Sequence, residues 1–94
     1  MSKKRKLHRL IVTITSAYQG LSKSKTYKNQ PFYYLNLEEE TILGKRKDAV
    51  YAFFNLTNKK FWQVLEKQAF KNQKYLFFCE KRNRGWRLKE VKEL

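Results

Sequence analysis

Residues 49–94, AVYAFFNLTNKKFWQVLEKQAFKNQKYLFFCEKRNRGWRLKEVKEL, are the stretch that decides the fold. Residues 49–56 are nearly all apolar on both faces, which predicts a strand at the centre of a sheet. Residues 58–70 predict a helix that begins at Asn58, a residue type favoured at helix N-caps. Four apolar residues recur along one side of this helix, so we expect them to face the core rather than a ligand. They are Phe61, Trp62, Leu65 and Ala69.

Two more strands follow the helix. Residues 73–81 are mostly apolar and residues 86–94 alternate large apolar with charged residues, so both segments predict strands. The residues between them, RNRG at 82–85, place Asn83 and Gly85 where a tight hairpin turn needs a positive φ. The helix is therefore followed by a β-hairpin with a basic turn.

The first half of the chain predicts two further strands. Residues 7–18 are rich in β-branched residues and predict the first strand. Residues 19–30 are polar and predict a long loop, a feature that is often functional in a small domain. Residues 32–40 predict the second strand, which is followed by a turn through Gly44 with a basic tip.

Alternation along these two strands indicates which side chains are buried. In the first strand the apolar face consists of Leu10, Val12 and Ile14. In the second strand both faces are apolar enough to lie in the core, and the pattern leaves the choice open. The two candidate faces are Tyr33, Leu35 and Leu37 on one side, and Phe32, Tyr34 and Asn36 on the other.

The predicted order of elements is β-β-β-α-β-β. Five strands with a helix between the third and the fourth are typical of the OB-fold, a five-stranded, partly open barrel. A barrel also hides the edges of strands that are apolar on both faces. We therefore expect an all-β fold with one helix, formed by residues 7–94 as a single domain, and a flexible basic arm at residues 1–6.

Charge and aromatic content together indicate the class of ligand. The 94 residues include 22 Lys and Arg against 8 Asp and Glu, a net charge of +14. Residues 1–30 carry no acidic residue. Such a balance favours a polyanionic partner. Aromatic residues make up 16% of the chain, and rings beside cations are typical of proteins that bind unpaired nucleic acid.

Several other classes of protein do not fit the sequence. One cysteine, Cys79, and one histidine, His8, allow neither an internal disulfide nor a tetrahedral zinc site. Asp48 is the only aspartate, and the chain has no glycine-rich phosphate loop, so we expect no enzyme activity and no cofactor. We also expect no membrane span and no signal peptide, and hence a cytoplasmic, nucleoid or organelle-matrix location.

Residues 49–94 resemble the corresponding part of the bacterial-type single-stranded DNA-binding proteins. The shared features are a strand rich in valine, alanine and aromatics, a helix, a lysine-bearing turn, a strand that ends in an acidic residue and a final amphipathic strand. The resemblance implies an OB-fold and a role with single-stranded DNA, as in DNA replication. The chain stops at WRLKEVKEL without the acidic tail of that family, so we expect no recruitment of partners through such a tail.

The candidate binding residues follow from the predicted barrel, because in an OB-fold the second and third strands form the floor of a groove and two loops form its walls. Rings of the floor are expected to stack on bases, although part of the aromatic residues must fill the core. The floor candidates are Phe32, Tyr34, Tyr51 and Phe53. The wall candidates are Lys23, Lys25, Tyr27 and Lys28 in the long loop, and Arg82, Arg84 and Trp86 at the last hairpin.

The basic tip at Lys45, Arg46 and Lys47 is a further candidate for nucleic-acid contact. The carboxylate run Glu38–Glu40 precedes it in the same predicted hairpin. Two interpretations remain open for these carboxylates. They repel phosphate from one rim of the barrel, or they pair with the three cations across the hairpin.

The leading hypothesis is a non-catalytic protein that binds single-stranded nucleic acid, DNA in preference to RNA, with little sequence specificity. Two alternatives remain: an RNA-binding structural subunit of a ribosome or similar particle, and an OB-fold adaptor whose groove binds protein. The sequence leaves open whether the chain is a homo-oligomer or a subunit of a larger nucleoprotein complex.

Overall fold

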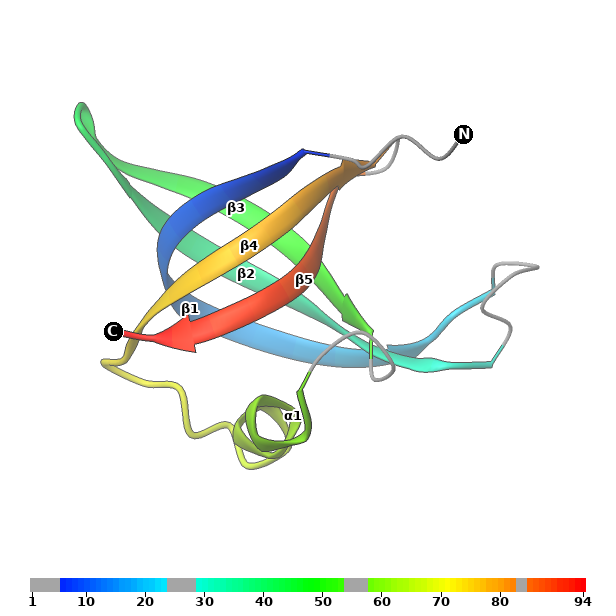
Figure 1. Ribbon diagram of the computed structural model, residues 1–94. Coiled ribbons are helices and arrows are strands. Elements are labelled where there is room, and N and C mark those ends of the chain that lie inside the picture. The colour runs from blue at the N-terminus through cyan, green and yellow to red at the C-terminus, as the bar shows by residue number, and fades with distance from the viewer. Residues whose placement is uncertain (1–5, 24–28, 54–57, 83–84) are drawn as a thin grey trace.

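A computed structural model describes residues 6–23, 29–53, 58–82 and 85–94 of the chain (Figure 1). The predicted basic arm at residues 1–6 lies outside these ranges except for Lys6, which is exposed. The elements follow the predicted order β-β-β-α-β-β. They are β1 (Leu7–Leu21), β2 (Pro31–Thr41), β3 (Gly44–Phe53), α1 (Lys59–Glu66), β4 (Lys74–Arg82) and β5 (Gly85–Glu93).

The five strands form a closed barrel in the order β1-β2-β3-β5-β4. β1 is long enough to pair with β2 along one part and with β4 along another, and both pairings are antiparallel. The barrel closes where β3 and β5 run parallel, with Val50 opposite Trp86 and Tyr51 opposite Arg87. Strand order, closure and the position of the helix are those of an OB-fold, so the predicted fold class is confirmed.

Two strands are longer than the sequence predicts. β1 continues to Leu21 instead of ending at residue 18, because its last residues pair with the start of β2. β3 begins at Gly44 instead of residue 49, so the basic tip is part of the strand rather than a turn. Its cations lie opposite Glu38–Glu40, and opposite charges across a ladder stabilise strand pairing. The last predicted residues of this strand, 54–56, lie outside the described residues.

The helix begins where the sequence predicts and ends early. Oδ1 of Asn58 accepts a hydrogen bond from the backbone N–H of Phe61 at 2.7 Å, which satisfies one donor of the first turn. The helix ends at Glu66 instead of residue 70. Gln68 has a φ of 54°, the left-handed conformation that commonly terminates helices. Ala69, which the helical pattern placed on the core face, is therefore exposed.

The core fills the inside of the barrel. In β1 the predicted apolar face of Leu10, Val12 and Ile14 is buried. In β2 the buried face consists of Tyr33, Leu35 and Leu37, which settles the choice that alternation left open. The opposite face of β2, with Phe32 and Tyr34, is therefore directed outward. Cys79 of β4 is also fully buried, as the apolar strand around it predicts.

Helix α1 closes the lower end of the barrel in Figure 1. The ring of Trp62 lies 4.9 Å from the ring of Tyr33, and the ring of Phe61 lies 5.3 Å from that of Tyr75, both edge to face. Phe61, Trp62 and Leu65 are buried, and each such side chain contributes about 1.5–3 kcal/mol by leaving water. The predicted role of the helical stripe in the core is thus confirmed for these three residues. Within the described ranges, no helix is long and apolar enough to span a membrane.

Candidate nucleic-acid interface

A groove of about 680 Å³ lies where β2, β3 and β5 meet the ends of β1 and β4. Its walls come from the residues that follow β1 and from the hairpin between β4 and β5, which are the two loops expected to flank an OB-fold groove. Its lining combines aromatic rings with cationic side chains. The rings are Phe32, Tyr51, Phe53 and Trp86, and the cations are Lys23, Arg82 and Arg87.

The floor of the groove continues into a row of four touching rings on β2 and β3. Phe32 lies opposite Phe53 and Tyr34 lies opposite Tyr51 in the ladder, so all four point to the outer face. The centroids of Phe53 and Phe32 are 5.6 Å apart, those of Phe32 and Tyr51 5.7 Å, and those of Tyr51 and Tyr34 5.1 Å. A base inserted between two rings needs about 6.8 Å, twice the stacking distance of about 3.4 Å. Bases can therefore stack on this row but not between its rings.

Gly20 of β1 supports the position of Phe32. The two residues are partners in the β1–β2 ladder, and a Cβ atom on Gly20 would lie 2.9 Å from the tip of the Phe32 ring. The absence of a side chain allows the ring to rest against the β1 backbone. The sequence predicted Gly20 as a loop residue, and its role becomes visible only once β1 and β2 are paired.

Tyr18 extends the aromatic row onto β1. It lies opposite Tyr34 in the ladder, and its side chain is 62% exposed. Sequence reasoning missed this residue because it was predicted to end the first strand. One feature of the sequence could have indicated it: Tyr18 is an aromatic residue at the end of a β-branched strand, and the next strand carries outward aromatic residues.

Phe53 lines the groove as predicted, but its ring is not available for stacking. The residue is only 8% exposed, and the guanidinium of Arg87 lies over its ring, with Cζ 5.1 Å from the centroid. This is a cation–π contact. The prediction that Phe53 itself offers a free ring is therefore corrected: the parallel pairing of β3 with β5 brings Arg87 over it.

Trp86 contributes to the groove and to the core at once. Its indole lies edge to face against the ring of His8 at 4.9 Å, and it packs against the buried cluster of the barrel. The residue is half-buried and also lines the groove. A substitution at Trp86 would therefore disturb both binding and stability.

The cationic side chains at the groove differ in their exposure and in the contacts that they make. Lys23 is exposed at the end of the described part of the long loop. Arg82 is half-buried, and its Nε forms an ion pair with Oε1 of Glu80. Arg87 is half-buried against Phe53. Four other predicted binding residues lie outside the described ranges: Lys25, Tyr27, Lys28 and Arg84.

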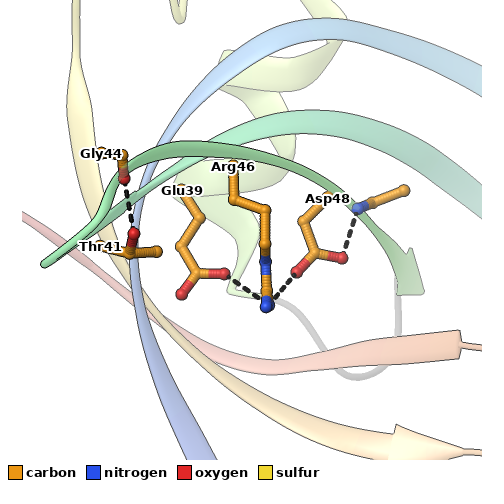
Figure 2. A network of polar contacts seen from close by, with 6 residues as sticks. Glu39, Thr41, Gly44, Arg46 and Asp48 are labelled. Atoms are coloured by element: carbon orange, nitrogen blue, oxygen red, sulfur yellow. Dashed lines mark hydrogen bonds and ion pairs between the residues drawn. The ribbon is translucent and has the colours of Figure 1, made fainter.

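The basic tip lies at the opposite end of the β2–β3 ladder. Seven ladder positions separate Phe32 from Glu39, the partner of Arg46, which corresponds to about 23 Å at 3.3 Å per residue. Nη2 of Arg46 lies 3.1 Å from Oε1 of Glu39 and 3.3 Å from Oδ2 of Asp48 (Figure 2). Nζ of Lys45 lies 3.7 Å from Oε2 of Glu38. The interpretation that these carboxylates pair across the hairpin is confirmed for Lys45 and Arg46.

The structure therefore divides the predicted site residues into two groups. Phe32, Tyr34, Tyr51, Phe53, Lys23, Arg82 and Trp86 come together at the groove or on the row next to it. Lys45, Arg46 and Lys47 lie away from it, at the hairpin end. The sequence did not indicate that Lys45–Lys47 lie at the far end of the strand that carries Tyr51, because this strand was predicted to begin only after these three residues.

The carboxyl of Glu40 and the thiol of Cys79 have pKa values shifted by their surroundings. The ammonium of Lys74 donates a hydrogen bond to Glu40, with Nζ and Oε1 2.6 Å apart, and holds the pKa of this carboxyl below its ordinary value. Burial, together with the charges of Asp48 and Glu39, raises the pKa of the Cys79 thiol to about 12, which keeps it protonated and unreactive. Among the described residues, no three His, Cys, Asp or Glu side chains gather to hold a metal ion.

Comparisons of the chain with protein-family models, with curated proteins and with solved structures find no match in any of the three.

Proposed function

We propose that the chain binds single-stranded nucleic acid, DNA in preference to RNA, with little sequence specificity and without catalysis. One observation carries the proposal: a continuous row of outward rings runs into a groove lined by three cations, in a chain with a net charge of +14. Each ring face accepts any base, and each cation accepts any phosphate. The preference for DNA rests on the resemblance of residues 49–94 to single-stranded DNA-binding proteins.

The ring row favours unpaired bases over a duplex. In a duplex the faces of the bases are covered by neighbouring bases, so the rings on the surface of the barrel cannot stack on them. Stacking on aromatic side chains contributes about 1–3 kcal/mol per base. Phosphate contacts alone would not separate the two forms, because both carry the same charged backbone.

The length of the contact is limited by the outer face of β2. Along this face the side chains change from rings at Phe32 and Tyr34 to Asn36 and then to carboxylates at Glu38 and Glu40. These carboxylates are paired with Lys45 and Lys74, so the hairpin end offers neither a ring for stacking nor an excess of positive charge, and we expect the contact to end before it. Because Arg87 covers the ring of Phe53, the three remaining rings of the row have room for about three stacked bases, near the low end of the range for an OB-fold.

A competition experiment tests this function. A fluorescein-labelled 20-nucleotide single-stranded DNA is bound to the purified protein and displaced by unlabelled single-stranded DNA, duplex DNA or RNA of the same sequence. We expect single-stranded DNA to compete at least tenfold better than duplex, and better than RNA. Equal competition by duplex would exclude the stacking part of the proposal, and stronger competition by RNA would reassign the ligand.

The salt dependence of the same binding reaction tests the role of the cations. If about four to six phosphates are neutralised, log K should fall with log salt with a slope of about −3 to −4, since each contact contributes about 0.7 for a single strand. A slope near zero would show that the positive charge has another purpose, such as binding a protein partner.

A further inference from the structure

Glu80 of β4 is an unexpected carboxylate beside two arginines that line the groove. Among the described residues it is the one charged side chain that is buried, with 7% of its surface exposed. It lies opposite Arg87 in the β4–β5 ladder and two residues before Arg82, and both arginines line the groove. A carboxylate here weakens the attraction of the groove for an anion, and its burial has a desolvation cost.

The contact that Glu80 makes suggests a reason for its position. Its Oε1 forms an ion pair with Nε of Arg82, whose side chain remains 33% exposed. Nε lies at the inner edge of the guanidinium, so this contact leaves the outer edge, formed by the two terminal amino groups, for a second partner. A guanidinium binds phosphate through two parallel hydrogen bonds in one plane, and its orientation therefore decides whether it can bind.

We propose that Glu80 is a positioning residue: it holds the Arg82 guanidinium so that its outer edge binds a phosphate of the strand stacked on Phe32 and Tyr51. This inference rests on the proposed function. It assigns the ligand of Arg82 as a backbone phosphate rather than a base. It also explains why the groove retains a carboxylate in a chain that otherwise attracts anions.

The substitution Glu80→Gln separates positioning from simple electrostatics, because the two predict opposite signs. Removal of a negative charge from an anion-binding groove should strengthen binding and steepen the salt dependence if only charge matters. If Glu80 orients Arg82, the neutral amide holds the guanidinium weakly and the phosphate contact is lost. We then expect affinity for a 20-nucleotide oligo-dT to fall by about three- to tenfold, and the salt slope to decrease in magnitude by about 0.7.

Glu40→Gln is the matched control. It adds the same unit of charge and also breaks an ion pair, that with Lys74, but on the exposed hairpin end. We expect its affinity to equal or slightly exceed that of the wild type. An increase in affinity for both Glu80→Gln and Glu40→Gln would overturn the proposal, while the proposed function would stand. Failure of the wild-type protein to bind the oligonucleotide would instead refute the function itself.

Two further variants keep the proposal testable if Glu80→Gln folds poorly. Glu80→Asp keeps the charge but is shorter by one methylene, so we expect a lower affinity at unchanged net charge and an unchanged circular dichroism spectrum. The double variant Glu80→Gln with Arg82→Gln should bind no more weakly than Arg82→Gln alone, because Glu80 acts through Arg82. A loss caused by Glu80→Gln in the Arg82→Gln background, or wild-type affinity in Glu80→Asp, would contradict the assignment.

Discussion

The two ends of the β2–β3 ladder have the same backbone and opposite surface chemistry. At the groove end the outward positions carry touching rings beside three cations, one of which, Arg82, is paired with the carboxylate of Glu80. At the hairpin end the same alternation carries charges in equal number. There, four carboxylates (Glu38, Glu39, Glu40 and Asp48) lie among four cations (Lys45, Arg46, Lys47 and Lys74).

Net charge alone therefore does not locate a binding surface on this protein. Paired charges at the hairpin end cancel beyond about 10 Å at moderate salt, so this end contributes little field to attract a polyanion. Figure 1 shows the β2–β3 hairpin projecting at the upper left. Its tip carries Ile42 and Leu43, both fully exposed. Cations outnumber carboxylates beside the rings, and this is the end at which binding is proposed.

The largest expected effect is the loss of a ring from the middle of the row. Tyr51 contacts both Phe32 and Tyr34, and it lines the groove. Tyr51→Leu keeps an apolar side chain but removes the stacking face. We expect affinity for single-stranded DNA to fall by about 1–3 kcal/mol, with an unchanged salt slope because a ring releases no counterions. Fluorescence anisotropy titrations at several salt concentrations measure both quantities.

The control for this experiment is a double substitution at the other end, Ile42→Ser with Leu43→Ser. It removes two fully exposed apolar side chains from the hairpin tip. We expect its affinity to stay within about twofold of the wild type, since surface changes without partners have small effects. A loss of affinity as large as that of Tyr51→Leu would show that the hairpin end also binds the single-stranded DNA, and would contradict binding at the groove end alone.

A smaller effect is expected from single cations, and here the two ends give a direct contrast. Lys23→Gln removes an exposed cation from the groove, and Lys45→Gln removes one that is paired with Glu38. We expect Lys23→Gln to reduce the salt slope by about 0.7, which corresponds to about fivefold in affinity at 0.1 M salt. Lys45→Gln should leave the slope unchanged. Equal effects of the two substitutions would show that net charge, and not its position, determines binding.

The sequence predicted the order of the elements, the helix start and the buried face of the first strand because these depend on local patterns. Alternation placed Leu10, Val12 and Ile14 in the core, and Asn58 marked the N-cap. The side chain of Tyr51 was placed on the outward face of its strand once the order of elements indicated a barrel. Such features can be predicted from residues close to one another in the sequence, or from the number and order of the elements.

Several features of the site that the sequence did not predict arise from pairing between strands that are distant in the chain. Tyr18 and Gly20 join the site only because β1 pairs with β2, and Arg87 covers Phe53 only because β5 pairs in parallel with β3. Glu80 was not considered for the site, although it lies two residues before Arg82 on the same strand, because its place opposite Arg87 depends on the pairing of β4 with β5. Local periodicity indicates which face a residue occupies but not what lies across from it.

The smallest expected effect concerns the stability of the hairpin end. The Lys74 ammonium lowers the pKa of Glu40 in the folded state below its ordinary value of 4.5. The stabilisation from this pair is therefore complete above pH 4.5 and is lost as the pH falls through the lower pKa of the folded protein. Urea unfolding should show wild type more stable than Glu40→Gln by a small, constant amount near pH 7. The difference should shrink with acidification below pH 4.5 and with added salt, since the pair is exposed. A difference in stability that grew on acidification would mean that Lys74 does not stabilise the ionised Glu40. The charges at the hairpin end would then not be stabilised by pairing.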